Sequence, residues 1–148
     1  MKVSEAIRRS GVAIEVDRTV HDAASIMEQA GVGSLAVLDG DQLAGIVTDR
    51  DLVRRALAKG LDPEARVDGV MSSPVTTVDA DADLHDVFAM FRVHAVRRLA
   101  VTKEEHFVGM ISIDDLLIDL VGDLADLARP VTAEVIFGHR DSPVPSTT

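Results

Sequence analysis

An internal repeat is the sequence feature that most restricts how this chain can fold. When the sequence is laid over itself so that Val20 falls on Leu84, the two copies align without a gap. Matching residues recur in that register: His21 with His85, Asp22 with Asp86, Leu35 with Leu99, Val37 with Val101, Gly45 with Gly109 and Asp51 with Asp115. A gapless register of this length indicates a duplicated structural unit.

Both copies have the same order of predicted elements, β-α-β-β-α. A first helix opens at Thr19 and at Asp83, each followed three residues later by an aspartate, which is the spacing of an N-terminal cap. A polar turn separates the second and third strands, and a second helix starts near Arg50 and near Asp114. The predicted strands cover residues 12–14, 35–38 and 43–47 in the first copy and 76–78, 99–101 and 107–111 in the second.

These elements predict an α+β fold. The helix between the first two strands of each copy implies a parallel pair, and the tight turn adds an antiparallel neighbour. Neither copy alone has enough elements to bury its sheet, so we expect the two β-α-β-β-α repeats to pack pseudo-symmetrically through their sheets. The expected organisation is repeat 1 at residues 1–59, a linker at 60–65, repeat 2 at 66–128 and a largely flexible C-terminal extension at 129–148.

The last helix is expected to run from about Asp114 to Ala128 and to stop at Pro130. Its face is widely apolar, with leucines and valines at helical spacing. Beyond the proline, residues 133–137 have the composition of one short additional strand.

Composition excludes several classes of function. The formal net charge of −10 disfavours nucleic-acid binding, which depends on Lys and Arg neutralising phosphates, and the chain has four Phe but no Trp or Tyr for stacking on bases. No cysteine is present, and the five histidines do not pair at metal-ligand spacing, so we expect neither a disulfide nor a metal site. No apolar run has the length of a membrane span and no secretory leader is recognisable, which makes the cytoplasm the expected location.

The pattern with the strongest chemical meaning closes the third strand of each copy. It reads Gly-Ile-Val-Thr-Asp-Arg-Asp at 45–51 and Gly-Met-Ile-Ser-Ile-Asp-Asp at 109–115, or glycine, two apolar residues, a hydroxyl residue, two residues and aspartate. The hydroxyls of Thr48 and Ser112 stand where a strand meets a helix, a position that favours an anion. The carboxylates of Asp51 and Asp115 can each accept two hydrogen bonds from the hydroxyls of a ribose, and the glycine leaves room for a flat base.

Through this pattern the chain resembles the CBS domains, the modules named after cystathionine β-synthase, over roughly residues 2–128. In that family the pattern marks a nucleotide site, so the resemblance implies a non-catalytic regulatory pair that binds an adenine nucleotide between its repeats. It also implies that adenine lies against the short strands around Ile14 and Val78. Some family members use a basic pair before the central strand to reach the phosphates, and Arg97 and Arg98 match that pair.

The first copy departs from this basic pattern, since Gly33 and Ser34 stand where the second has Arg97 and Arg98. Arg50 or Arg54 is a possible substitute source of positive charge. The two clefts are therefore expected to be unequal. If only one cleft binds a ligand, we expect it to be the cleft of the second motif, which would combine Arg97 and Arg98 with Ser112 and Asp115.

A structural interpretation of the pattern stays open. Thr48 with Asp51, and Ser112 with Asp115, also have the spacing of ordinary capping boxes. Under that interpretation the chain is a structural dimerisation or interaction module with vestigial clefts and no nucleotide. The favoured hypothesis is a sensor of AMP, ADP or ATP that forms a homodimer and acts on an effector protein, without enzymatic activity, required cofactor, nucleic acid or membrane partner.

Overall fold

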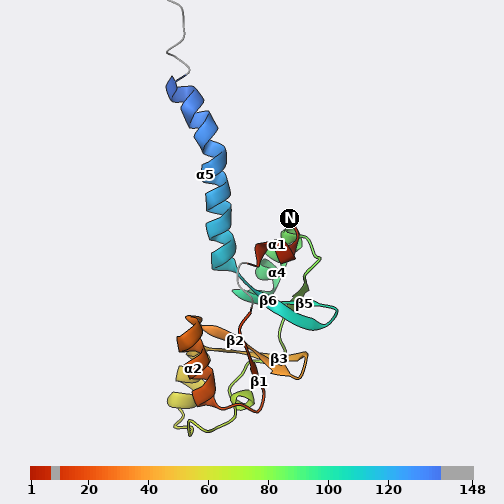
Figure 1. Ribbon diagram of the computed structural model, residues 1–148, viewed down its shortest axis with the longest axis vertical. Helices are drawn as coiled ribbons and strands as arrows, with labels where there is room; N and C mark the ends of the chain where they lie inside the picture. Colours follow the sequence, from red (N-terminus) through yellow and green to blue (C-terminus); the bar gives the residue numbers. More distant parts are fainter. Residues whose placement is uncertain (8–10, 138–148) are drawn as a thin grey trace, which may run out of the picture. The chain divides into compact units, whose positions relative to one another are not determined.

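The computed structural model describes residues 1–7 and 11–137, apart from the side chains of Asp115 and of residues 131–137. The chain divides into two compact units, Met1–Ser112 and Ile113–Thr148. The first unit contains both three-stranded sheets, which Figure 1 shows with their helices. The second unit is described as far as the end of one helix, α5, at Ile113–Phe137.

The first sheet has the order β1-β2-β3 and the second the order β4-β5-β6, as the repeat predicts. In each sheet the first pair is parallel and the second is antiparallel. The strands are β1 Ala13–Glu15, β2 Ser34–Asp39 and β3 Gln42–Thr48, followed by β4 Thr77–Asp79, β5 Arg98–Lys103 and β6 His106–Ser112. The α+β class and the strand order are thus confirmed.

The first helices of the two repeats occupy equivalent places, α2 at Val20–Ala30 and α4 at Leu84–His94. Thr19 and Asp22 form a reciprocal capping box at the start of α2, whereas Asp83 caps α4 by accepting a hydrogen bond from the backbone N–H of His85. Both helices end on a residue with left-handed backbone, Gly31 or Ala95. The apolar residues at helical spacing face the sheets and are buried: Val20, Ala23 and Met27 in α2, Val87 and Phe91 in α4.

The first unit has two halves, one built on the sheet β1-β2-β3 and the other on the sheet β4-β5-β6. The central strand of each sheet forms the core of its half. Leu35, Ala36 and Val37 of β2 are fully buried, and so are Leu99, Ala100 and Val101 of β5. Three consecutive buried residues require both faces of the strand to be covered. Among the described residues, β3 and β6 lie in contact, which places the two repeats against each other through their sheets, as predicted.

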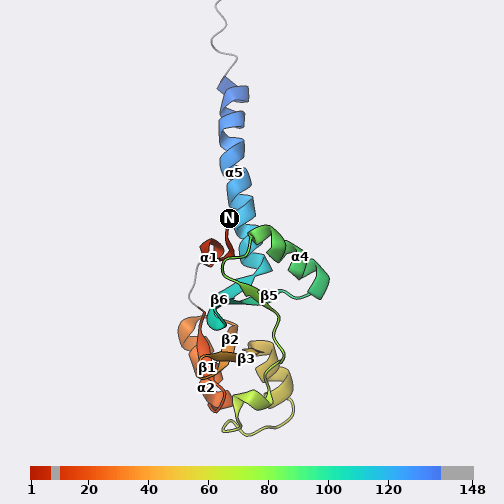
Figure 2. The same ribbon diagram turned by 90° about the vertical axis from the view of Figure 1, so that its right-hand side faces the viewer.

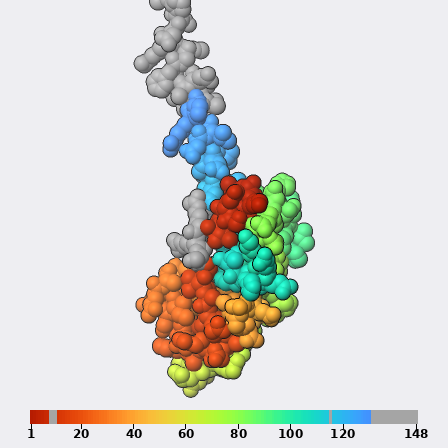
Figure 3. Space-filling view, turned by 45° about the vertical axis from the view of Figure 1, so that its right-hand side comes forward, coloured from red at the N-terminus to blue at the C-terminus, as the bar shows by residue number. Residues whose placement is uncertain are grey.

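Each half also receives a short segment from the other half. Helix α1, Val3–Ala6, packs on the second half, where the N–H groups of Val3 and Ser4 donate to the carbonyls of Ala82 and Ala80. Figures 1 and 2 both show α1 beside α4, and Figure 3 shows the first residues against the second half. Reciprocally, Val67 of the 3₁₀ helix η2, Val67–Gly69, is buried in the core of the first half together with Val70. Sequence reasoning missed this exchange.

The second helix of the first repeat differs from an ordinary α-helix. A single α turn, α3 at Asp49–Asp51, continues into the π-helix η1 at Leu52–Leu57. The N–H of Ala58 donates to the carbonyl of Val53 at 2.8 Å, which is the i→i+5 bond of a widened turn. This widening redirects the side chains that follow Asp51.

The prediction that the last helix stops at Pro130 is wrong, because α5 continues to Phe137 with Pro130 inside it. A proline inside a helix removes one hydrogen bond and crowds the carbonyl four residues earlier, but its fixed φ is itself helical, and α5 continues past Pro130. The strand predicted at residues 133–137 is wrong for the same reason, since that segment is helical. The rest of the predicted flexible extension, residues 138–148, lies outside the described residues.

Candidate functional site

Thr48 and Asp51 form the centre of the candidate site, at the junction of β3 and α3. The backbone N–H of Thr48 donates to Oδ2 of Asp51 at 2.9 Å, and the backbone N–H of Asp51 donates to Oγ1 of Thr48 at 3.1 Å. The capping interpretation of this pair is therefore confirmed. The other carboxylate oxygen, Oδ1, lies 3.8 Å from Nε of Arg55, and the Asp51 side chain is 17% exposed.

A cavity of about 230 Å³ opens beside this capping box. Pockets that enclose a whole drug-sized ligand have volumes of roughly 300 Å³ or more. This cavity is smaller, so it can enclose only part of a nucleotide. Its walls are mainly apolar and carry a few polar groups. The lining residues are Ile46, Thr48, Asp51, Ser72, Pro74, Val75, Thr76, Val96 and Arg98.

Arg98 contributes to this cavity from the second half of the chain. It starts β5 and is paired in register with Ser112 of β6, but it lines the cavity that contains Thr48 and Asp51. Arg98 therefore also belongs to the cavity of the first motif, which sequence reasoning did not expect. Its grouping with Ser112 and Asp115 stays a prediction, since the side chain of Asp115 lies outside the described residues. The strand pairing sets the neighbours of the backbone, whereas the packing of the two halves decides which cavity this residue lines. Arg97 is exposed and is not among the lining residues.

The segment from Ser72 to Thr76 forms a wall that sequence reasoning missed. Ser72 and Ile46 exchange two backbone hydrogen bonds, of 2.8 and 3.0 Å, which attach this segment to the edge of β3. A guanidinium nitrogen of Arg55 donates to the carbonyls of Val70 and Met71 at 3.3 and 3.0 Å. Nothing in the sequence pairs these residues, because the contacts join segments that are distant along the chain.

Gly45 explains how that segment can approach so closely. A Cβ at this position would lie 2.6 Å from the sulfur of Met71 and 2.8 Å from the carbonyl oxygen of Ser72. The glycine of the motif therefore admits a neighbouring backbone, not the flat base that the sequence suggested. It shapes the cavity indirectly, by letting the wall close on β3.

Ile14 and Val78 do not present their side chains to this cavity. They are 4% and 5% exposed, and each is the buried middle residue of its short strand. Contact of adenine with the short strands around these two residues stays a prediction. The lining residues nearest to Val78 in sequence are Val75 and Thr76, which lie just before β4.

The second copy of the motif is only partly described. Ser112 ends β6, and α5 begins at the next residue. The side chain of Asp115 lies outside the described residues, so the partners of this carboxylate are not specified.

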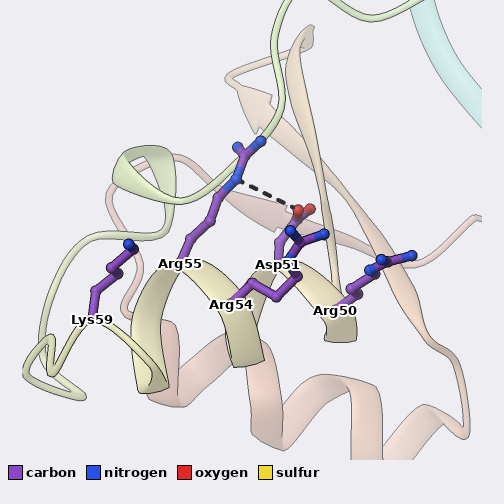
Figure 4. A pocket seen from close by; sticks show the side chains of 5 residues that line it. All are labelled: Arg50, Asp51, Arg54, Arg55 and Lys59. Atoms are coloured by element: carbon purple, nitrogen blue, oxygen red, sulfur yellow. Dashed lines mark ion pairs between the residues drawn. The ribbon is translucent and has the colours of Figure 1, made fainter.

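Arg50 lies on α3 and is exposed, outside the cavity that holds Arg98. It lines a different cavity of about 350 Å³, together with Asp51, Arg54, Arg55 and Lys59 (Figure 4). Asp51 is common to both cavities.

The described residues lack two features that would indicate other functions. No group of three or more His, Asp or Glu in this part of the chain is arranged to hold a metal ion. No helix in the same part is both long and apolar enough to cross a bilayer.

The chain is similar to several known proteins. Hypoxic response protein 1 of Mycobacterium tuberculosis is 33% identical over 119 residues, which cover 78% of this chain and 83% of that protein. A putative signal-transduction protein with CBS domains from Burkholderia ambifaria is 29% identical, with a TM-score of 0.73 over 83% of this chain and 96% of its own. A CBS domain protein from Pyrobaculum aerophilum, solved in complex with AMP, is 26% identical, with a TM-score of 0.69 over 82% and 99%.

The model of the CBS domain matches the sequence twice, at residues 3–58 and 67–122. These matches contain both copies of the motif and both sheets. The chain therefore belongs to the CBS-domain family, as a tandem pair of CBS repeats.

Proposed function

We propose that this CBS pair is a regulatory module that binds an adenine nucleotide, AMP, ADP or ATP, in the cavity beside Thr48 and Asp51. The observation that carries the proposal is the convergence of Asp51 from the first repeat and Arg98 from the second on one cavity with apolar walls. The AMP complex of the similar protein from Pyrobaculum aerophilum supports the choice of ligand.

Each part of a nucleotide has a suitable partner in this cavity. A carboxylate such as that of Asp51 accepts hydrogen bonds from ribose hydroxyls. An arginine such as Arg98 binds phosphate with two parallel hydrogen bonds. Ile46, Pro74 and Val75 supply apolar surface for the base. The remainder of the nucleotide would extend into solvent, in keeping with the size of the cavity.

The same arrangement suggests how binding regulates. A ligand held by Asp51 and Arg98 bridges the two repeats, so it favours whichever arrangement of the halves brings these side chains together. A ligand shifts a conformational equilibrium only by its difference in affinity for the two states. We propose that the favoured state alters the contact with an effector protein or a second copy, without catalysing a reaction.

A second nucleotide site, built on Ser112, Asp115 and Arg97, remains part of the proposal. The stoichiometry of binding tests it separately. One ligand per chain assigns binding to the cavity of Asp51 and Arg98, and two ligands per chain support both sites.

Isothermal titration with AMP, ADP, ATP, S-adenosylmethionine and NAD tests the main site. We expect Arg98→Ala to raise the dissociation constant about tenfold or more, since a charge-assisted hydrogen bond contributes roughly 1.5–3 kcal/mol. The matched control is Arg92→Ala, which removes an exposed arginine from α4. Absence of binding at millimolar concentration for every compound would disprove the proposal, as would equal affinity in wild type and Arg98→Ala.

One observation favours the alternative of a structural dimerisation module. An apolar cavity of about 260 Å³ lies between α2 and η1, and Leu57 on its rim is 77% exposed. An exposed apolar surface of this kind is typical of a protein contact. Light scattering of wild type and Leu57→Glu, with and without AMP, separates the hypotheses. A dimer that Leu57→Glu disrupts, in a protein that binds no nucleotide, would support the structural role.

A further inference from the structure

The segment from Arg50 to Lys59, which spans the end of α3, the π-helix η1 and the turn after it, carries an unusual concentration of positive charge. The whole chain has a formal net charge of −10, yet Arg50, Arg54, Arg55 and Lys59 fall within one short stretch. These four cations and Asp51 line the cavity of about 350 Å³. The lining therefore has a formal net charge of +3, from four positive groups and one negative group.

The four cations line one cavity, although a regular α-helix would not place them together. Arg50 and Lys59 are nine residues apart, which is about two and a half turns of an α-helix, so a regular helix would place them on opposite faces. In a widened turn with i→i+5 bonds, residues four and five apart lie over one another. Arg54 and Arg55 lie inside the π-helix, whereas Arg50 lies in the α turn before it and Lys59 in the turn after it, yet all four line one cavity. Figure 4 shows the four cationic side chains leaving successive parts of this segment.

Internal ion pairs neutralise only part of this charge. Asp51 lies 3.8 Å from Arg55, while Arg55 also donates to the carbonyls of Val70 and Met71. Asp49 accepts a hydrogen bond from the backbone N–H of Arg50, not from its guanidinium. Within residues 1–7 and 11–137, no acidic side chain forms an ion pair with Arg50, Arg54 or Lys59. Their mutual repulsion is therefore relieved only by solvent, salt or a bound anion.

We propose that the segment from Arg50 to Lys59, which includes η1, forms a binding site for a small oligophosphate anion, separate from the nucleotide cavity. A single phosphate group carries a charge of at most about −2, which is less than the lining supplies, so a chain of two or three phosphates is the better match. Arg50 and Arg54 provide the planar pairs of donors that phosphate oxygens accept, and Lys59 adds a compact charge, while Arg55 is held by Asp51 and the carbonyls of Val70 and Met71. The cavity is larger than the nucleotide cavity and is lined only by charged residues. Asp51 lies between the two sites and is the negative group of both.

Titration with inorganic tripolyphosphate at low ionic strength tests this site without any nucleoside. We expect Arg54→Gln/Lys59→Gln to raise the dissociation constant about tenfold or more, because two charged contacts are lost. Glutamine has nearly the helix propensity of the residues replaced, so the helix should be retained, and circular dichroism checks this. Arg92→Gln is the matched control, with an expected dissociation constant equal to that of wild type. Absence of binding at millimolar tripolyphosphate, or equal affinity in wild type and the double variant, would overturn the proposal.

Asp51→Asn distinguishes the oligophosphate site from the nucleotide cavity. The amide keeps a hydrogen-bond acceptor for the cap but removes the negative charge, so tripolyphosphate binding should strengthen while AMP binding weakens. If Asp51→Asn weakens the binding of both tripolyphosphate and AMP, tripolyphosphate occupies the nucleotide cavity and the proposal of a separate site is refuted. If AMP fails to bind at all while tripolyphosphate responds to Arg54→Gln/Lys59→Gln as expected, the nucleotide proposal fails alone.

Competition experiments identify the source of the phosphates. Displacement of tripolyphosphate by ATP but not by AMP would support a site for the phosphate tail of a nucleotide, and displacement by neither would support a free oligophosphate. Tighter binding of a poly-glutamate peptide than of tripolyphosphate would instead assign the surface to an acidic protein segment and overturn the proposal.

Discussion

Thr48 and Asp51 exchange two hydrogen bonds, of 2.9 and 3.1 Å, across the junction of β3 and α3. The same two residues line the cavity that Arg98 reaches from the other repeat. The capping role and the proposed binding role therefore coexist. Oδ2 of Asp51 accepts a hydrogen bond from the backbone N–H of Thr48. The other carboxylate oxygen of Asp51, Oδ1, lies 3.8 Å from Nε of Arg55.

Asp51→Ala should reduce both stability and nucleotide affinity. Loss of the cap should lower the free energy of unfolding by about 1 kcal/mol. Loss of the carboxylate should abolish the proposed contact with ribose. Asp22→Ala is the matched control, because Asp22 forms the equivalent box with Thr19 and does not line the cavity. Denaturant unfolding and titration with AMP should show destabilisation in both variants and weaker binding only in Asp51→Ala; equal AMP affinity in both would remove Asp51 from the site.

Gly45→Ala should separate the wall of the cavity from β3. The added methyl group would meet the sulfur of Met71 and the carbonyl of Ser72, and the latter is backbone that cannot move alone. Overpacking of this kind costs about 1–3 kcal/mol in the free energy of unfolding. Gly69→Ala is the control, since a Cβ there meets nothing within 4 Å. Urea unfolding should show a loss only for Gly45→Ala, together with weaker AMP binding, and an unchanged midpoint would contradict the close approach.

Ala95→Gly should stabilise the protein. Gly31 ends α2 with φ of 65°, and Ala95, its equivalent in the repeat, ends α4 with φ of 51°. Alanine is strained in this left-handed region, whereas glycine is not. We expect a gain of about 0.5–1 kcal/mol for Ala95→Gly and a loss of about 1 kcal/mol for Gly31→Ala. Thermal unfolding of both variants provides the measurement, and a loss of stability in Ala95→Gly would refute the interpretation.

Asp22 should contribute to stability in a pH-dependent way. Its hydrogen bond from the backbone N–H of Thr19, helped by the Thr19 hydroxyl and the charge of Arg18, lowers the pKa of Asp22 below its ordinary value of 3.8. Because the folded pKa is the lower one, the contribution is fully present above the unfolded pKa and is lost as the pH falls through the folded pKa. The loss therefore begins below about pH 4. Asp22→Asn should flatten the acid limb of the stability profile, and an NMR titration of Asp22 with a midpoint at or above 3.8 would contradict this.

Features that depend on local spacing could be predicted from the sequence. Apolar periodicity and turn residues located the strands within a residue or two, and the duplication predicted two sheets of the same order. The capping boxes at Thr19 and Thr48 were predictable because their partners are three residues away. The motif at residues 45–51 also identified the centre of the cavity.

The residues that complete the site come together only through contacts between distant segments of the folded chain. The exchange of Val3 and Val67 between the halves and the placement of Arg98 beside Asp51 depend on contacts across the chain, which local periodicity does not encode. The function of Gly45 became visible only with Met71 and Ser72 against it. The gathering of Arg50 and Lys59 at one cavity depends on the path of the chain from α3 through the π-helix η1 and beyond it, which single-residue propensities do not predict.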